Sequence, residues 1–195
     1  MTIVKNVTIT KYETIVKNVT IVKNVNTRRT SMTHLPLPLK HHPTTMDDKQ
    51  YKLDCRYMRM ARIWAENSYC KRRQVGALVV KDKMIISDGY NGTPSGFENV
   101  CEEDGVTKPY VLHAEANAIT KLARSSNNSD GSTLYVTASP CIECAKLIIQ
   151  AGIKRVVYAE KYRLNDGIEL MERAGIKVVY LNPDDASQEE AEPRT

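Results

Sequence analysis

The chain has 195 residues, of which 42% are apolar and 26% charged, proportions that are usual for a soluble globular protein. A run of about 18 apolar residues, which a membrane span would need, does not occur, and the N-terminus lacks the apolar stretch of a secretory signal. These absences exclude a membrane partner and predict a cytoplasmic protein. The formal charge of +5 arises from residues 1–45, which hold seven basic residues and one acidic residue. Residues 46–195 hold 21 basic and 22 acidic residues. The near-neutral remainder argues against nucleic acid as its partner.

The N-terminal segment differs in kind from the rest of the chain. Thr-Ile-Val-Lys-Asn-Val-Thr-Ile occurs at residues 2–9 and again at 14–21, and residues 27–45 are polar and rich in proline. Repeats this short do not build a solenoid. We therefore expect residues 1–45 to form a disordered low-complexity extension, although Met46 offers an alternative start. Residues 46–183 are expected to form one domain, and residues 184–195 an acidic, frayed tail.

Helix-type and strand-type patterns alternate through the domain. Apolar spacing and helix-favouring composition predict helices at 50–67, 113–124, 141–150 and 167–174. Short apolar runs predict strands at 75–80, 84–89, 133–137, 155–159 and 177–181. The segment 89–96 is rich in glycine and is predicted to be a loop. Strands that alternate with helices indicate an α/β sandwich with some parallel pairing.

Two of the predicted helices begin with residues that bind metals. His113-Ala-Glu115 opens one, and Pro140-Cys-Ile-Glu-Cys144 opens the other, with a strand between them. In a βαβ arrangement both helix N-termini lie at the same sheet edge, so these side chains can converge. One imidazole and two thiolates form a ligand set for Zn²⁺ that leaves a fourth position for water. Glu115 can carry that water's proton without being a ligand.

Other interpretations of these residues stay open. Cys141 and Cys144 fit a redox pair or part of a structural zinc site, and Glu115 fits an ordinary first-turn acid. The count of five cysteines and the missing export signal argue against a disulfide framework. Cys55, Cys70 and Cys101 are therefore expected to be buried or free thiols. The order H-x-E, then P-C-x-x-C, is nevertheless a known signature of zinc deaminases, and it is hard to meet by chance.

Longer stretches of sequence indicate which family of zinc deaminases the chain resembles. Residues 89–96, 112–119, 134–137 and 140–153 closely resemble the deoxycytidylate (dCMP) deaminases, and the resemblance covers roughly residues 50–181. It implies a cytidine-deaminase-like three-layer sandwich, with a central five-stranded mixed sheet flanked by helices. It also implies a homo-oligomer that binds Zn²⁺. Such enzymes often respond to dCTP and dTTP as effectors, near the loop at 89–96.

The resemblance implies hydrolysis of dCMP to dUMP and ammonia by zinc-activated hydroxide, which supplies dUMP for dTMP synthesis. His113, Cys141 and Cys144 would hold the metal, and Glu115 would be catalytic. The expected substrate contacts are Asn91, Ala114, Tyr162, Arg73 and Arg163; the last two are candidates for the phosphate, together with Lys71, Arg72 and Lys161.

Three alternatives remain at this point. The chain could be another zinc-dependent nucleoside or tRNA adenosine deaminase, or a non-catalytic module stabilised by zinc. The basic extension at residues 1–45 could also bind nucleic acid, which would make that binding depend on salt.

Overall fold

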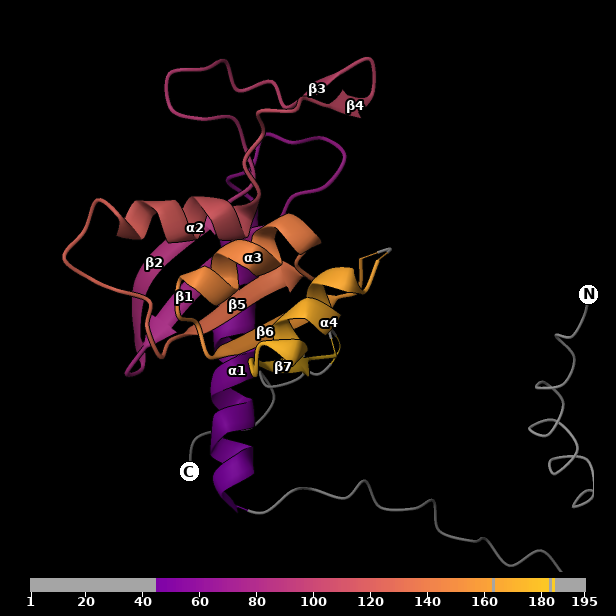
Figure 1. Cartoon of the computed structure of the whole chain (residues 1–195). Coiled ribbons are helices and arrows are strands. Elements are labelled where there is room, and N and C mark those ends of the chain that lie inside the picture. Colours follow the sequence, from indigo (N-terminus) through magenta and orange to yellow (C-terminus); the bar gives the residue numbers. More distant parts are fainter. Residues whose placement is uncertain (1–44, 163, 183, 185–195) are drawn as a thin grey trace, which may run out of the picture. The chain divides into compact units, whose positions relative to one another are not determined.

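The computed structural model describes residues 45–162, 164–182 and 184 (Figure 1). The predicted extension at 1–45 and the predicted tail at 184–195 lie almost entirely outside the described residues, as does Arg163. Within the described part of the chain, no helix is both long enough and apolar enough to cross a membrane.

A five-stranded mixed sheet forms the centre of the domain, as predicted. Its strand order is β2-β1-β5-β6-β7. The strands are β1 (Gly76–Lys81), β2 (Met84–Tyr90), β5 (Thr133–Ala138), β6 (Arg155–Glu160) and β7 (Lys177–Tyr180). β1 pairs antiparallel with β2 and β5, whereas β5, β6 and β7 are parallel to one another. All five strands lie within about two residues of the predicted positions.

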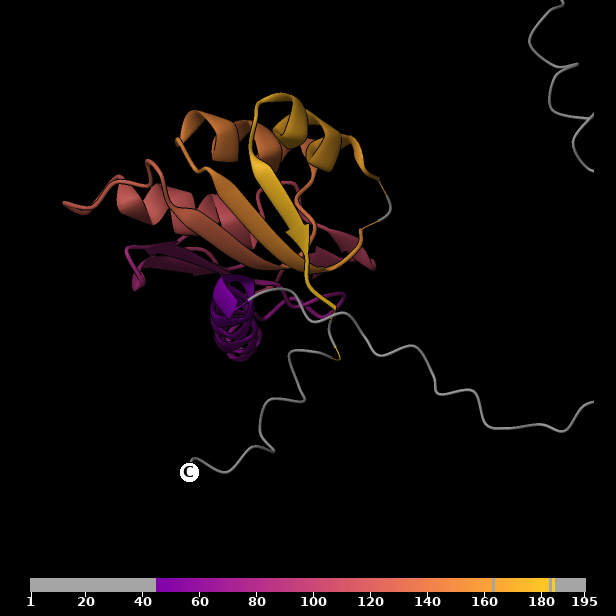
Figure 2. The ribbon, with the colours of Figure 1, turned by 90° about the horizontal axis from the view of Figure 1, so that it is seen from below.

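Helices cover both faces of the sheet, which gives three layers (Figure 2). α1 (Thr45–Ala65) lies on one face, and α2 (Ala114–Leu122), α3 (Ile142–Gln150) and α4 (Asp166–Arg173) lie on the other. Successive side chains of a strand point to opposite faces of the sheet, so the strands contribute to two cores, one on each face. In β1, Leu78 packs with the α1 core, whereas Val79 packs with the core under the other helices. The cytidine-deaminase-like sandwich is thereby confirmed.

Two glycines allow helices to lie directly against the sheet. A Cβ atom at Gly76 would come within 2.0 Å of the Ala61 carbonyl oxygen in α1. A Cβ atom at Gly89 would come within 2.2 Å of the Ala114 carbonyl oxygen, in the first turn of α2. Any larger residue at Gly89 must therefore displace the start of α2, where the predicted metal ligand His113 is located.

One feature was not predicted. Residues 91–112, here called the arm, extend beyond the sheet and carry a small hairpin of β3 (Glu102–Glu103) and β4 (Val106–Thr107) (Figure 1). Cys101 of the arm forms a disulfide with Cys70, and their Cα atoms lie 5.1 Å apart. Cys70 and Cys101 are buried, as expected, but the expectation that they are thiols was wrong, because an odd cysteine count does not exclude a single disulfide. Cys55 is a buried thiol, as expected.

Candidate functional site

The two predicted metal-binding segments meet at one edge of the sheet. β5 ends at Ala138, and the chain then passes through Ser139 and Pro140 to Cys141, the N-cap of α3. His113 is the N-cap of α2, and both N-cap residues have extended backbone. Because α2 leads back into β5, its N-terminus lies at the same strand end as that of α3. The positive ends of both helix dipoles therefore face one place, which favours thiolates there.

The three predicted ligand atoms lie close together. His113 Nδ1 is 3.5 Å from Cys141 Sγ and 3.4 Å from Cys144 Sγ. All three atoms lie within 4.8 Å of one another. Zinc bonds of about 2.0 Å to nitrogen and about 2.3 Å to sulfur, at tetrahedral angles, place nitrogen and sulfur about 3.5 Å apart. The geometry of the donors therefore fits a zinc ion, with one tetrahedral position left over.

The ligand atoms also perturb one another's protonation. Hydrogen bonds from Cys144 and then from His113 lower the pKa of Cys141 to about 3. The hydrogen bond to Cys141, and then burial, raise the pKa of Cys144. The hydrogen bond with Cys141 raises the pKa of His113 despite the opposing effect of burial. Thus the protein alone stabilises one thiolate in this cluster, and a divalent cation would favour both.

Glu115 lies beside the cluster and is 4% exposed. Burial is the main cause that raises the pKa of its carboxyl group above the ordinary value. A buried carboxyl group with a raised pKa is suited to take up and return protons during a reaction. This property separates Glu115 from Glu143, an acid in the first turn of α3 whose side chain is 73% exposed and pairs with Lys146.

A cavity of about 380 Å³ opens over these residues. This volume lies in the range of small-molecule sites. Its wall includes His113, Glu115 and Cys141, together with four of the five predicted substrate contacts, namely Asn91, Ala114, Tyr162 and Arg73. The structure therefore places the predicted substrate contacts next to the predicted metal site, except Arg163, which is outside the described residues.

Tyr162 and Arg73 are held together on one side of the cavity. The Tyr162 amide donates to Ser139 Oγ at 2.7 Å, which anchors its backbone. The Arg73 guanidinium carbon lies 5.7 Å from the centre of the Tyr162 ring. An Arg73 nitrogen also pairs with a Glu160 carboxylate oxygen at 2.5 Å. An aromatic ring and a cation are therefore neighbours in a cavity whose wall also contains the metal ligands His113 and Cys141.

Asn91 also lines the cavity, and its side-chain amide bonds to the neighbouring backbone. Its Oδ1 accepts from the Val75 amide at 2.7 Å, and its Nδ2 donates to the Arg73 carbonyl oxygen at 2.9 Å. These bonds fix the segment that carries Arg73. The amide nitrogen has a second hydrogen, so Asn91 can hold the wall and also reach a ligand.

The cavity wall contains residues that the sequence did not single out. Glu102 and Thr107, both in the arm hairpin, line it beside Cys70 and Arg72. Nothing in their local sequence marks them, because only the fold of the arm brings them to the cavity. The disulfide partner Cys70 could have been noticed only by pairing it with Cys101, 31 residues away.

Comparison with known proteins agrees with this geometry. Residues 51–160 match the family model described as the cytidine and deoxycytidylate deaminase zinc-binding region. That range contains all three candidate ligands and Glu115. Zinc, the cofactor predicted from the sequence, is therefore confirmed as the cofactor of this family.

Named relatives and a solved structure point to the same family. The chain is 40% identical to ComE operon protein 2 of Bacillus subtilis over 135 residues, which are 66% of this chain and 71% of that protein. It is 42% identical to human deoxycytidylate deaminase over 120 residues, 56% of this chain and 66% of that protein. The dCMP deaminase of cyanophage S-TIM5, solved in complex with dCMP and dUMP, is 46% identical with a TM-score of 0.64. That match covers 72% of this chain and all of the phage chain. The resemblance seen in the sequence is thus confirmed, and the chain belongs to the zinc-binding cytidine and deoxycytidylate deaminase family.

Proposed function

We propose that this protein hydrolyses dCMP to dUMP and ammonia and so supplies dUMP for dTMP synthesis. The observation that carries the proposal is the convergence of His113, Cys141 and Cys144 beside the buried Glu115, next to a nucleotide-sized cavity. Relatives named deoxycytidylate deaminase, and the phage enzyme solved with dCMP and dUMP, support this choice of substrate.

In this proposal His113, Cys141 and Cys144 hold the zinc ion. When bound, zinc lowers the pKa of water toward about 7 and so supplies hydroxide at neutral pH. The position of His113 and Cys141 at two helix N-termini fixes their side chains in one part of the cavity wall, here called the metal end. The amino group of the base must therefore point toward this end.

Glu115 carries the protons. It accepts the proton that water loses as oxygen attacks C4 of the base, and it donates a proton to N3. It then takes the remaining proton from that oxygen, now bonded to C4, and delivers it to the amino group, so that the C4–N bond breaks, a C4 carbonyl forms and ammonia leaves. Burial raises the pKa of Glu115, which brings its proton affinity nearer to that of the groups with which it exchanges protons.

The other cavity residues position the nucleotide. Tyr162 stacks on the base, Ala114 and Asn91 contact the base and the sugar, and Arg73 faces the phosphate. Support comes from their common position in the cavity wall. Lys161 is a further cation in that wall. Arg163 keeps its predicted role as a phosphate contact, two residues further along the chain.

A second cavity is a candidate effector site. It has a volume of about 510 Å³ and is lined by the 92–97 loop and by Lys121 and Arg124. Two cations beside a glycine-rich loop suit a polyphosphate, as in dCTP or dTTP. Binding of either effector at this cavity, a homo-oligomeric assembly and a cytoplasmic location are parts of the proposal.

A substrate panel tests the function. Purified zinc-loaded protein is assayed with dCMP, CMP, deoxycytidine and a tRNA anticodon stem, with and without dCTP and dTTP. We expect the highest kcat/KM with dCMP. Turnover of another substrate while dCMP is untouched would favour another zinc deaminase. Tight zinc binding without any turnover would favour a non-catalytic module.

A further inference from the structure

The loop at residues 68–75 is joined to the arm by a disulfide and by hydrogen bonds. The disulfide joins Cys70 to Cys101. At the next positions, Glu102 accepts from the main-chain amide of Lys71 at 3.2 Å and from that of Arg72 at 3.2 Å. These two linkages, here called the clasp, are adjacent in sequence on both sides. Together they fix both the position and the direction of the loop.

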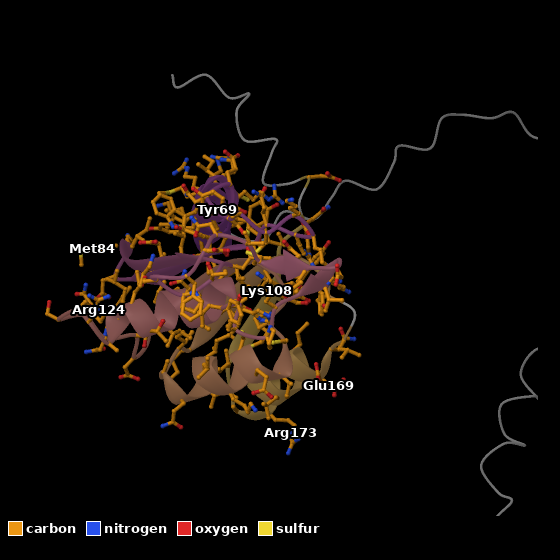
Figure 3. All side chains as sticks on the ribbon, turned by 90° about the horizontal axis from the view of Figure 1, so that it is seen from above. Tyr69, Met84, Lys108, Arg124, Glu169 and Arg173 are labelled. Carbon is orange, nitrogen blue, oxygen red and sulfur yellow. A yellow bond between two sulfur atoms is a disulfide. The ribbon has the colours of Figure 1, made fainter. Side chains whose placement is uncertain are left out.

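The hairpin of the arm adds a third contact to the same loop. Glu102 is the cross-strand partner of Thr107. Thr107 Oγ1 accepts from Arg72 Nη1 at 3.1 Å. One hairpin therefore binds both the backbone and the side chain of the loop at Arg72. The arm end of the molecule is seen in Figure 3, where Tyr69 of the loop and Lys108 of the arm are labelled.

The loop held in this way carries cations into the substrate cavity. Arg72 and Arg73 both line the cavity, as do Cys70, Glu102 and Thr107. The loop lies between α1 and β1 and has no regular hydrogen-bonded structure of its own. Fixing such residues costs conformational entropy, and pre-organisation moves that cost from binding to folding. The Glu102 carboxylate accepts from two amides, so these hydrogen bonds are charge-assisted and hold the loop backbone at two consecutive residues.

We propose that Glu102 is a positioning residue, which acts with the Cys70–Cys101 disulfide to hold Arg72 and Arg73 in place for the phosphate of the nucleotide. This inference rests on the proposed function, because it takes a nucleoside monophosphate as the ligand. Glu102 itself touches the loop amides and not the reacting atoms. Its role is to make the enzyme select a nucleotide over the corresponding nucleoside.

The test compares binding of dUMP and deoxyuridine, which differ only in the phosphate. Titration calorimetry on the zinc-loaded full chain gives both dissociation constants for the wild type, Glu102→Ala and Glu102→Gln. We expect Glu102→Ala to weaken dUMP binding by roughly ten-fold, with a much smaller change for deoxyuridine. Glu102→Gln keeps one acceptor oxygen and should fall between the wild type and Glu102→Ala. Glu103→Ala, which removes an exposed acid from the same strand, is the matched control and should bind dUMP like the wild type.

Cys101→Ser tests the covalent half of the clasp. It should weaken dUMP binding in the same direction, and the double variant with Glu102→Ala should show less than the product of the two single effects. Melting temperature and zinc content are measured for every variant, to show that it is folded.

Several results would overturn the inference. Unchanged dUMP binding in Glu102→Ala, or equal losses for dUMP and deoxyuridine, would show that the clasp does not act on the phosphate. Tighter dUMP binding in Glu102→Gln would show that Glu102 repels the phosphate. A second zinc ion per chain that is lost in Cys101→Ser would show that the cysteines bind metal and not each other. Absence of dCMP turnover in the wild type would instead contradict the proposed function, and it is distinguishable because nucleotide binding is measured directly.

Discussion

Two polar clusters on opposite faces of the sheet each contain a buried acidic side chain. They differ in which groups stabilise the buried charge. Under α1, Asp54 is 3% exposed, and its carboxylate accepts from Arg155 Nη1 at 2.8 Å and from the Tyr135 hydroxyl at 2.7 Å. Gln50 donates to the same oxygen at 2.8 Å. Here the protein supplies both the buried anion and the groups that stabilise it. This cluster joins α1 to β5 and β6 and needs nothing from outside.

The cluster on the other face consists mainly of side chains that can bind a metal ion. His113, Cys141 and Cys144 bring three metal-binding atoms within 4.8 Å of one another, and Glu115 adds a buried carboxyl group. Such a convergence is costly unless a cation joins it. A buried charge with its own protein partners thus indicates a structural role, whereas converging metal ligands indicate a bound metal and chemistry.

The largest effect should follow from removing a metal ligand. Cys141→Ser or His113→Ala should reduce bound zinc to well below one ion per chain and reduce kcat/KM for dCMP by at least about 10⁴-fold, because no hydroxide is then supplied at neutral pH. Metal analysis and a deamination assay measure both. Cys55→Ala, on the α1 face, is the matched control and should keep zinc and turnover. Full activity in Cys141→Ser would contradict the assignment of Cys141 as a metal ligand.

Breaking the opposite cluster should affect stability and not chemistry. Arg155→Met leaves Asp54 as a buried anion without its cation, and we expect the free energy of unfolding to fall by about 3 kcal/mol. Denaturant unfolding measures this change, and zinc per folded chain should stay the same. The double variant Asp54→Asn/Arg155→Met should recover part of the loss, since the uncompensated charge is then gone. Loss of zinc without loss of stability would contradict this division of roles.

A smaller effect is expected from Tyr135→Phe. The variant removes one hydrogen bond to a charged acceptor while keeping the ring, which should cost about 1.5 kcal/mol of unfolding free energy. The ring centre lies 5.0 Å from that of Tyr57, and this contact should be kept. Thermal unfolding, compared with that of Arg155→Met, measures the difference. A loss as large as that of Arg155→Met would mean that the ion pair is not the main partner of Asp54.

The sequence predicted the catalytic face better than the opposite one. The strands, the helices α2 and α3 and the residues at their N-termini follow from short-range patterns, since apolar periodicity and ligand spacing act within a few residues. The pairing of Asp54 with Arg155 spans 101 positions, and no local pattern marks it.

The arm hairpin was not predicted from the sequence, for a related reason. Its strands are two residues long, and its contacts with the 68–75 loop form only in the folded chain. Local propensity therefore gave no signal for Glu102, and the composition rule for disulfides pointed the wrong way for Cys70 and Cys101.

The most direct test of zinc-dependent catalysis through Glu115 is dCMP turnover by Glu115→Gln, with zinc quantified on the same samples. The amide keeps the shape of Glu115 but cannot carry protons, so we expect one zinc ion per chain and a loss of kcat of roughly 10³-fold or more. Glu143→Gln, on the exposed first turn of α3, is the control and should turn over dCMP like the wild type. Wild-type turnover in zinc-loaded Glu115→Gln would contradict the assignment of Glu115 as the proton carrier.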